Sequence, residues 1–267
     1  MAKRKKIQEA LKPANRAVFF DFDGTWLRRQ SFYYWVICAE EFGLFSERVG
    51  IEARDRYRAY REREIKHTQF MEYLVETVLN PDTMDGISVE LANRIAELVI
   101  LRYGKLTHQF TERISQSSQK AGYRRVIVTG ALHEVVQAFC LSRGIEDIYA
   151  TRFPQRDERL IGHGQIEWVG RKGDAVEDFA RRNDIDLAES VAIGDTERDA
   201  SMLCRVGYPI CINPCEELEE IARKEEWPIV MEWKGRHGIF RSDRHGSLMD
   251  ESPATIFPSK LVNHFYR

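Results

Sequence analysis

The chain has 267 residues, 43% of them hydrophobic and 31% charged, a composition that suits a globular fold with a substantial core, either one large domain or one domain with an insertion. A net charge of −2 gives no reason to expect a nucleic acid or a membrane surface as partner. No apolar run is long enough for membrane insertion, and the basic start Lys3 to Lys6 lacks a following apolar segment, so we expect a solvated terminus. The odd number of cysteines, five, indicates reduced thiols and a cytoplasmic protein.

The first expected strand runs from Ala17 to Phe22, because this run is short, apolar and rich in aromatic and β-branched residues. It contains Asp21 and is followed by Asp23 and Gly24. Two carboxylates two positions apart on an extended backbone point to the same side and repel each other unless a cation lies between them. Mg²⁺ with a bound phosphate is the simplest such cation. An ordinary turn after a strand explains the same residues.

Residues 27–106 show helical periodicity, which predicts a helical bundle inserted after the first strand. Long insertions often cover an active site. The aromatic run Phe32 to Trp35 is explained by core packing of this bundle or by an apolar substrate pocket. The arginines between Arg54 and Arg63 alternate with acidic residues, which indicates a solvated helix rather than a nucleic-acid-binding surface.

From Phe110 onward, strands and helices alternate, which predicts a parallel sheet covered by helices on both faces. A hairpin is expected from Leu160 to Trp168, and a helix from Arg198 to Arg205. The polar composition of the tail, residues 233–267, predicts loops. Its apolar residues instead predict docking onto the core or onto a second subunit in a homodimer. The expected strands are 123–129, 148–151, 190–193, 208–212 and 228–231.

Polar residues follow several of these strands, at the edge where open α/β sheets bind ligands. The second strand ends in Thr129 and Gly130, a later strand is followed by Asp195 with Asp199 one helical turn on, and Lys172 begins a helix. Carboxylates, a hydroxyl, glycine amides and an ammonium group together suit a metal-bound phosphate. Taken singly, each residue has an ordinary explanation: Lys172 as a solvated lysine, Thr129 as the end of a strand, and Asp199 as the partner of an arginine on its own helix.

The four segments resemble, in order, the motifs of the haloacid dehalogenase superfamily of phosphohydrolases. They are Asp21–Thr25, Thr129–Gly130, Lys172–Gly173 and Gly194–Asp199. The resemblance extends from about residue 17 to residue 231, and the helical insertion is similar to the cap of the phosphoserine phosphatase-like branch. It implies an α/β fold, a Rossmann-like parallel sheet with helices on both faces and an inserted all-α cap. The implied domains are a core of residues 1–26 and 107–232, a cap of residues 27–106 and a tail of residues 233–267.

The resemblance also implies roles for the two carboxylates of the first motif. Asp21 is expected to be the nucleophile that forms an aspartyl-phosphate. Asp23 is expected to protonate the leaving alkoxide and then to activate the water that cleaves the intermediate. The carboxyl group at position 23 argues against a P-type ATPase, which carries threonine there, and against the metal-independent dehalogenases.

The remaining motif residues are expected to bind phosphate and metal. Thr129, Gly130 and Lys172 are expected to bind the phosphoryl oxygens. A Mg²⁺ ion is expected to be held by Asp21, Asp23 and Asp195, with Asp199 supporting them from behind. The implied function is Mg²⁺-dependent hydrolysis of a small phosphorylated metabolite. Two alternatives are phosphotransfer to an alcohol and a non-catalytic phosphate-binding module.

Two departures from the family pattern stand out, one that concerns the substrate and one that concerns how the metal waters or the phosphate are held. Phosphoserine phosphatases place a glutamate shortly after the first motif, where this chain has Gln30 preceded by Arg28 and Arg29. Either these arginines meet a second anionic group of the substrate or they are solvated. Arg198 also replaces the asparagine that often precedes the last motif aspartate, Asp199.

Overall fold

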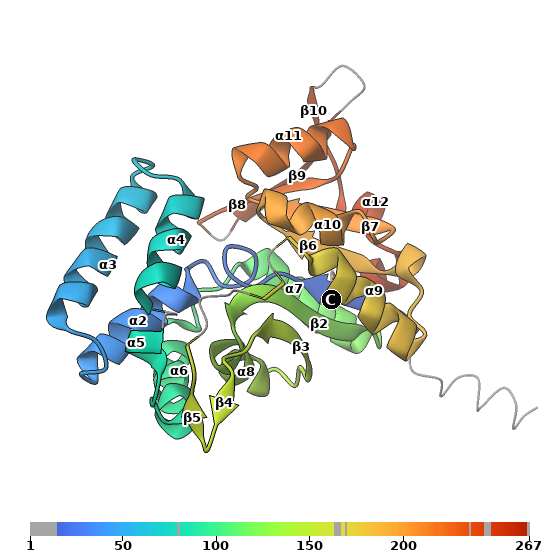
Figure 1. The fold of residues 1–267 in the computed structure, drawn as a ribbon. Helices are drawn as coiled ribbons and strands as arrows, with labels where there is room; N and C mark the ends of the chain where they lie inside the picture. The colour runs from blue at the N-terminus through green and yellow to red at the C-terminus, as the bar shows by residue number, and fades with distance from the viewer. Residues whose placement is uncertain are drawn as a thin grey trace, which may run out of the picture. The chain divides into compact units, whose positions relative to one another are not determined.

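The computed structural model describes residues 15–78, 81–162, 167–168, 170–234, 236–242 and 247–265; the expected solvated terminus at Lys3 to Lys6 lies outside them. The chain forms two compact units (Figure 1). The first contains Met1–Trp26, Thr107–Val128 and Gly170–Arg267, and therefore includes the expected tail. The second joins the expected insertion, Leu27–Leu106, to Thr129–Val169.

Within the described residues, eight strands form one sheet in the order β10-β9-β8-β7-β6-β1-β2-β3. The pairs β1–β2, β1–β6, β6–β7 and β7–β8 are parallel, whereas β8–β9 and β9–β10 are antiparallel. The strands are β1 (Ala17–Phe20), β2 (Arg124–Leu132), β3 (Asp147–Thr151), β6 (Val191–Gly194), β7 (Tyr208–Ile212), β8 (Ile229–Trp233), β9 (Arg236–Ser242) and β10 (Leu248–Asp250).

β1 lies inside the sheet, between β2 and β6, with Val18 opposite Arg125 on one side and Val191 on the other. All four of its residues are completely buried. A strand covered on both faces needs apolar side chains at every position, which is why this segment reads as a continuous apolar run rather than as an alternating one. The carboxyl end of β1 therefore delivers Asp21 to the middle of the strand-end edge.

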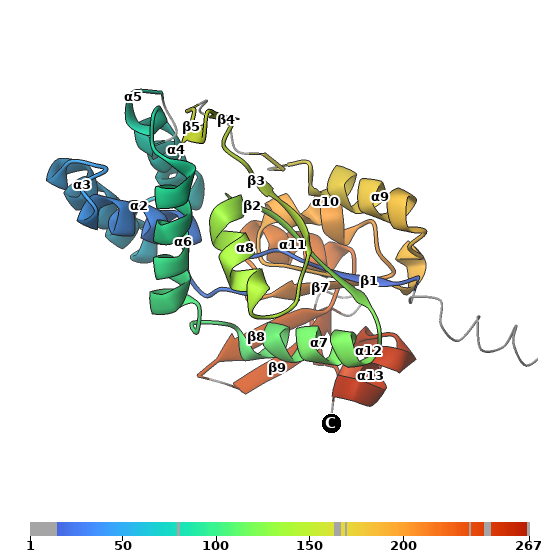
Figure 2. The same cartoon turned by 90° about the horizontal axis from the view of Figure 1, so that it is seen from below.

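Helices cover both faces of the sheet in the first unit. In Figure 2, α7 and α13 lie on one face and α9, α10 and α11 on the other. This confirms the expected α/β class. Arg198–Arg205 was expected to be one helix but consists of a 3₁₀ turn, η2 (Glu197–Asp199), and the short α10. The helices are α7 (Gln109–Lys120), α9 (Lys172–Asn183), α10 (Ala200–Leu203), α11 (Glu216–Lys224), α12 (Pro253–Ile256) and α13 (Ser259–Phe265), with a further 3₁₀ turn at Leu187–Glu189.

The tail docks onto the core through aromatic side chains. The ring centroids of Phe265 on α13 and Phe110 on α7 are 5.7 Å apart, and Phe257 lies 5.2 Å from Phe265. Phe110, Phe257 and Phe265 are all at most 4% exposed, so their burial offsets the conformational entropy lost on ordering this segment. Of the two expectations for residues 233–267, docking onto the core is therefore correct for the described part.

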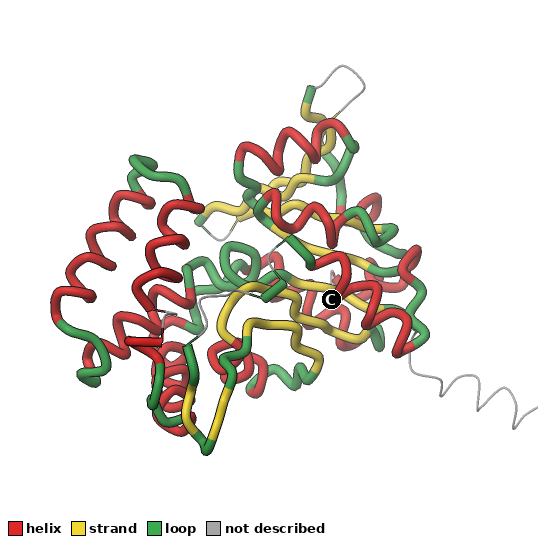
Figure 3. The backbone as a smooth tube through the Cα atoms, viewed as in Figure 1, coloured by secondary structure: helices red, strands yellow, loops and turns green. Residues whose placement is uncertain are grey.

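The second unit is mostly helical, as its helix colouring in Figure 3 shows. Its aromatic run forms part of the helical core, because Tyr33 stacks on Tyr57 with centroids 4.0 Å apart and Tyr34 lies 3.9 Å from Tyr103. Trp35 is only 1% exposed. The elements are α2 (Ser31–Glu41), α3 (Glu47–Arg61), α4 (His67–Val78), α5 (Pro81–Met84), α6 (Val89–Tyr103), α8 (His133–Leu141), β4 (Gln155–Arg156) and β5 (Arg159–Leu160), together with β3.

Residues 163–166 of the hairpin expected at Leu160 to Trp168 lie outside the described residues, so that expectation stays a prediction. A hairpin earlier in the chain pairs β4 with β5, and its two turn residues, Asp157 and Glu158, have φ of 50° and 59°. Positive φ at both turn positions is the geometry of tight two-residue hairpins, which usually contain glycine or asparagine there. Asp157 and Glu158 give no such signal, so the sequence does not predict this hairpin.

Candidate active site

Asp21 follows β1 directly and is anchored by its backbone, whose N–H donates to the carbonyl of Ile193 on β6 at 3.0 Å. Its side chain is buried, with the residue 5% exposed. The chain then turns, and the N–H of Trp26 donates to the carbonyl of Phe22 at 2.9 Å. Gly24 has φ of +89° inside this turn, a conformation that glycine adopts readily and other residues rarely do.

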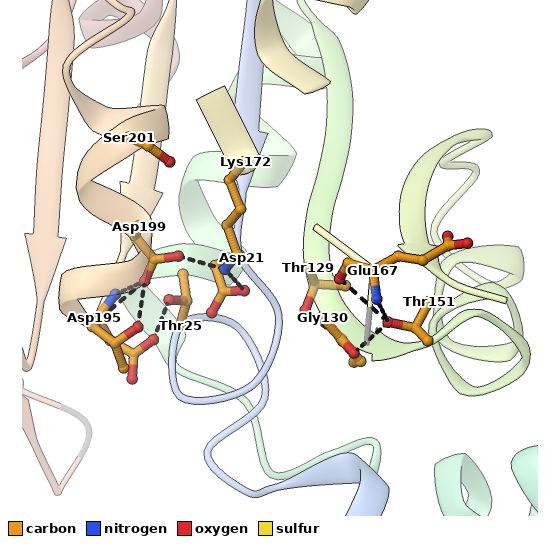
Figure 4. Close-up of polar contacts among 12 residues, drawn as sticks. Asp21, Thr25, Thr129, Gly130, Thr151, Glu167, Lys172, Asp195, Asp199 and Ser201 are labelled. Atoms are coloured by element: carbon orange, nitrogen blue, oxygen red, sulfur yellow. Dashed lines mark hydrogen bonds and ion pairs between the residues drawn. The ribbon is translucent and has the colours of Figure 1, made fainter. Parts of the chain in front are cut away.

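Lys172, the first residue of α9, bridges two carboxylates (Figure 4). Its Nζ lies 2.6 Å from Asp21 Oδ1 and 2.5 Å from Asp199 Oδ1. Lys172, Asp21 and Asp199 are each at most 5% exposed. Charge-assisted hydrogen bonds in so dry an environment fix the position of all three groups.

Asp195 follows β6 and faces the same turn. Its Oδ1 accepts a hydrogen bond from the hydroxyl of the fully buried Thr25 at 2.8 Å. Asp199 Oδ2 accepts the backbone N–H groups of Asp195 at 3.0 Å and Thr196 at 2.9 Å, and the Thr196 hydroxyl at 3.2 Å. Asp199 therefore uses one oxygen to hold Lys172 and the other to hold the turn that carries Asp195.

The pKa directions follow from this burial. Burial raises the pKa of Asp21 above its usual value, while Lys172 opposes the rise and Asp199 adds to it. Burial also raises the pKa of Asp195 well above its usual range, with Asp21 and Asp199 adding to the effect. Burial lowers the pKa of Lys172, but Asp199 and Asp21 outweigh this effect, so its pKa is raised and it stays charged. The three carboxylates exceed the single ammonium in charge, so the cluster is short of a cation.

The residues fit a divalent metal ion. Asp21, Asp195 and Asp199 each offer a carboxylate oxygen, and these oxygens lie within 4.8 Å of one another. Hard cations such as Mg²⁺ bind clusters of oxygen ligands. Since both Asp199 oxygens already accept hydrogen bonds, Asp21 and Asp195 are the better ligands and Asp199 suits the supporting role. Asp23, which is partly buried, lies two residues beyond Asp21 on the same turn.

Thr129 and Gly130 lie at the end of β2, in the second unit. The Oγ1 of Thr129, which is 2% exposed, accepts from the N–H of Ala131 at 3.2 Å. The carbonyl of Gly130 accepts from the hydroxyl of Thr151 at 2.8 Å, and that hydroxyl accepts from the N–H of Glu167 at 3.1 Å (Figure 4). The placement of Thr129 and Gly130 against the aspartates of the first unit stays a prediction.

The three possible substrate-binding residues also belong to the second unit. The backbone N–H of Arg28 donates to the carbonyl of Leu106 at 2.7 Å, and the carbonyl of Gln30 accepts from the N–H of Tyr34 at 3.3 Å. The Nε of Arg29 is buried, with no hydrogen-bond partner in the described part of the chain. In the first unit, Arg198 pairs with its neighbour Glu197 at 3.6 Å. Contact of Arg28, Arg29 or Gln30 with a substrate stays a prediction.

Sequence reasoning missed the residues that hold the turn after β1. The hydroxyl of Thr111 on α7 donates to the carbonyl of Thr25 at 2.8 Å, and Trp26 Nε1 donates to Glu112 at 2.8 Å. The N–H of His108 donates to the carbonyl of Trp26 at 2.9 Å. These partners lie more than 80 positions apart in sequence, so no local motif links them; Thr25 alone had a signal, its place in the first motif.

Among the described helices, none combines the length and apolar character that crossing a membrane requires. All five cysteines are free thiols.

The chain is similar to several known proteins. A phosphoserine phosphatase of Archaeoglobus fulgidus is 26% identical over 210 residues, 78% of this chain and 55% of that protein; the chain thus spans about half of that relative's length. A Bordetella pertussis Tohama I protein of unknown function superposes with a TM-score of 0.62 at 24% identity, covering 81% of this chain and 98% of that one. A phospho-aspartyl intermediate analogue of phosphoserine phosphatase superposes with a TM-score of 0.55 at 21% identity, covering 78% and 90%.

These likenesses to solved structures concern the fold. The model of the haloacid dehalogenase-like hydrolase family matches residues 18–203, which include every motif residue described above. That match covers more than half of the chain, and the chain therefore belongs to the haloacid dehalogenase-like hydrolase family.

Proposed function

We propose that this protein is a Mg²⁺-dependent phosphatase that hydrolyses a small phosphomonoester through an aspartyl-phosphate intermediate. The observation that carries the proposal is the buried bridge from Lys172 to Asp21 and Asp199 beside Asp195. A purely structural ion pair needs one carboxylate per ammonium. The excess of buried carboxylate here suits a centre that receives a metal ion and a phosphoryl group.

In the proposed reaction, a carboxylate oxygen of Asp21 attacks phosphorus, the P–O bond to the alcohol breaks, and the phosphoryl group is transferred to Asp21. Lys172 orients Asp21 through the 2.6 Å contact and offers its positive charge to the phosphoryl oxygens. Asp23 gives a proton to the leaving alkoxide. The same residue then takes a proton from the water that attacks the aspartyl-phosphate, releasing phosphate and restoring Asp21.

Asp21 and Asp195 would hold the Mg²⁺ ion, together with the backbone carbonyl of Asp23. When bound, the ion neutralises charge on the phosphate and favours nucleophilic attack. Thr25 fixes Asp195 through its hydroxyl, and Asp199 fixes both Lys172 and the Asp195 turn. We assign the remaining phosphoryl oxygens to Thr129 and the Gly130 amide.

The proposed substrate is a small phosphorylated metabolite. Phosphoserine phosphatases are among the relatives, but Gln30 stands where those enzymes are expected to carry a glutamate for the substrate ammonium. We therefore leave phosphoserine as one member of the test panel rather than as the assigned substrate. The five free thiols support a reducing compartment, the cytoplasm.

Hydrolysis of p-nitrophenyl phosphate with and without Mg²⁺ tests the proposal. We expect turnover that requires the metal and is lost in Asp21→Asn, because the amide is a poor nucleophile. Asp174→Asn is the matched control, since this exposed aspartate lies on the same helix as Lys172 and pairs only at the surface with Arg171. Equal activity in wild type and Asp21→Asn would refute the proposal. Product analysis with added alcohols distinguishes hydrolysis from phosphotransfer.

A further inference from the structure

Two titratable side chains at the start of α8 are buried, and each has one polar atom without a hydrogen-bond partner in the described part of the chain. His133 is 6% exposed and Glu134 is 8% exposed. Within the described residues, neither His133 Nδ1 nor Glu134 Oε2 has a partner, although both atoms are shielded from solvent. Leaving a buried polar group unpaired costs stability, so two of them side by side in the sequence need an explanation.

The same corner of the second unit contains further polar groups. The N-cap residue Leu132 provides no side-chain hydrogen bond to the first turn of α8, and the carboxyl group of Glu134 accepts from its own backbone N–H. The exposed Arg152, at the end of β3, is close enough to act electrostatically on both His133 and Glu134. Thr151 joins the ends of β3 and β2 through its hydrogen bond to the Gly130 carbonyl.

This corner adjoins the proposed phosphate-binding pair. β2 passes directly into α8, so His133 and Glu134 follow Gly130 by only three and four positions. All of these residues belong to the second unit. A phosphate held at Thr129 and Gly130 would therefore have its organic part within reach of the α8 start.

We propose that His133 and Glu134, at the start of α8, form a subsite that binds a hydroxyl group of the substrate's alcohol part. This inference rests on the proposed phosphatase function and narrows its substrate to a phosphomonoester of a hydroxylated alcohol, such as a polyol or sugar.

The chemistry of the subsite favours a hydroxyl over a charged group. A hydroxyl both donates and accepts, so it can donate to Glu134 Oε2 while accepting from an N–H of the helix start or from His133. An ammonium group only donates, and a carboxylate or a second phosphate only accepts and would face Glu134. Burial lowers the pKa of His133 to about 4, with Arg152 adding to the effect. The imidazole is therefore neutral near pH 7. Burial raises the pKa of Glu134, whereas the hydrogen bond from its own backbone N–H and the charge of Arg152 oppose the rise.

A matched pair of substrates tests the inference. Glycerol 3-phosphate and n-propyl phosphate share the phosphate and the three-carbon chain but differ in the two hydroxyls. We expect wild type to favour glycerol 3-phosphate by about tenfold or more in kcat/KM, because a hydrogen bond to a charged group is typically worth at least about that factor. Glu134→Leu is expected to reduce this ratio to near one while leaving kcat/KM for n-propyl phosphate unchanged.

Thermal unfolding and a control variant separate binding from structural effects. Glu134→Leu removes an unpaired buried oxygen along with a local hydrogen bond to the Glu134 backbone N–H, and these effects oppose each other. We therefore expect the melting temperature to stay nearly unchanged, and Glu134→Gln to keep the fold while reducing the ratio in part. Gln137→Ala, an exposed position on the same helix, should change nothing. A wild-type ratio near one, an unchanged ratio in Glu134→Leu, or an equal loss on both substrates with a lowered melting temperature would each overturn the inference.

Hydrolysis of p-nitrophenyl phosphate, glycerol 3-phosphate and n-propyl phosphate tests the subsite and the phosphatase activity separately. If p-nitrophenyl phosphate is hydrolysed but glycerol 3-phosphate is not preferred over n-propyl phosphate, only the subsite is refuted. If none of the three is hydrolysed, the phosphatase proposal fails. In that case the Kd values of glycerol 3-phosphate and n-propyl phosphate are measured by calorimetry for wild type and for Glu134→Leu. The subsite is supported if wild type binds glycerol 3-phosphate about tenfold more tightly and Glu134→Leu does not, and it is refuted otherwise.

Discussion

Gly24 lies so close to the Asp195 side chain that no residue with a Cβ atom fits at position 24 without a clash. A Cβ atom at Gly24 would lie 2.0 Å from Asp195 Oδ2, and φ at this position is +89°. Gly24→Ala therefore combines backbone strain with displacement of a proposed metal ligand. We expect loss of most phosphatase activity and a destabilisation of about 1 to 2 kcal/mol or more.

The matched control for this change is Gly43→Ala. Gly43 also has a positive φ, +71°, but nothing lies within 4 Å of its Cβ position. The Gly43→Ala variant should lose a similar amount of stability from backbone strain and keep full phosphatase activity. The two variants are compared by urea unfolding and by Mg²⁺-dependent turnover; equal retention of activity in both would show that the Gly24 contact does not position Asp195.

Removal of the Lys172 ammonium is expected to destabilise the fold strongly. Lys172→Met leaves Asp21 and Asp199 buried next to each other without a counter-charge, and breaking a buried pair in this way typically costs about 3 to 5 kcal/mol. Urea unfolding at pH 7 measures the change. Lys224→Met, at an exposed lysine in the last turn of α11, should stay within about 0.5 kcal/mol of wild type.

A second substitution tests the cause of that loss. In Lys172→Met with Asp199→Asn, one of the two unpaired carboxylates is gone, so part of the lost stability should return. The free energy of unfolding is compared in two backgrounds. If Asp199→Asn lowers the stability of Lys172→Met by as much as it lowers that of wild type, the two residues are not coupled.

Thr25→Val tests the hydroxyl that holds Asp195. The substitution keeps the side-chain shape but removes the 2.8 Å hydrogen bond to Asp195 Oδ1. A hydrogen bond to a charged group is worth about 1.5 to 3 kcal/mol, and we expect a stability loss of this order with a higher Mg²⁺ concentration for half-maximal activity. Thr25→Ser retains the hydroxyl and should restore the Mg²⁺ concentration for half-maximal activity to that of wild type. If Thr25→Ser restores neither this concentration nor the stability, the assigned role of the hydroxyl is wrong.

Glu232 on β8 gives a prediction for pH dependence. Its carboxylate accepts the N–H groups of Gln109 at 3.1 Å and Phe110 at 2.7 Å, and so caps the start of α7. Its Oε1 lies 3.4 Å from His108 Nδ1. Burial alone would raise the pKa of Glu232, but the hydrogen bonds from His108 and the two amides outweigh it and lower the pKa to about 2.

A lowered pKa in the folded state stabilises the fold at pH values above the ordinary glutamate pKa of 4.5. This contribution decreases as the pH falls from about 4.5 towards 2. We therefore expect Glu232→Gln to be less stable than wild type by about 2 kcal/mol at pH 7 and to approach it near pH 3. Denaturant unfolding across this range measures the difference, and a constant difference at every pH would contradict the assignment.

Strand-end reasoning on the sequence predicted the charged centre because each of its parts has a local signal. Asp21 and Asp195 follow apolar strands directly, Lys172 starts a helix, and Asp199 lies one turn after Asp195. In a parallel sheet the carboxyl ends of the strands share one edge, so sequence order was enough to predict that these four residues meet. The same reasoning extends to Thr129 and Gly130 but leaves their contacts with the aspartates as a prediction.

The sequence by itself determined the α/β fold and the identity of the buried carboxylates and lysine, because strand periodicity and strand-end residues are properties of short segments. Only the tertiary structure decided which groups hold them. Glu232 caps a helix more than 120 positions away, and Thr111 and Glu112 hold the turn after β1 from α7. Such hydrogen bonds depend on how elements pack rather than on local pattern, and an isolated glutamate or threonine gives no sign of its distant partner.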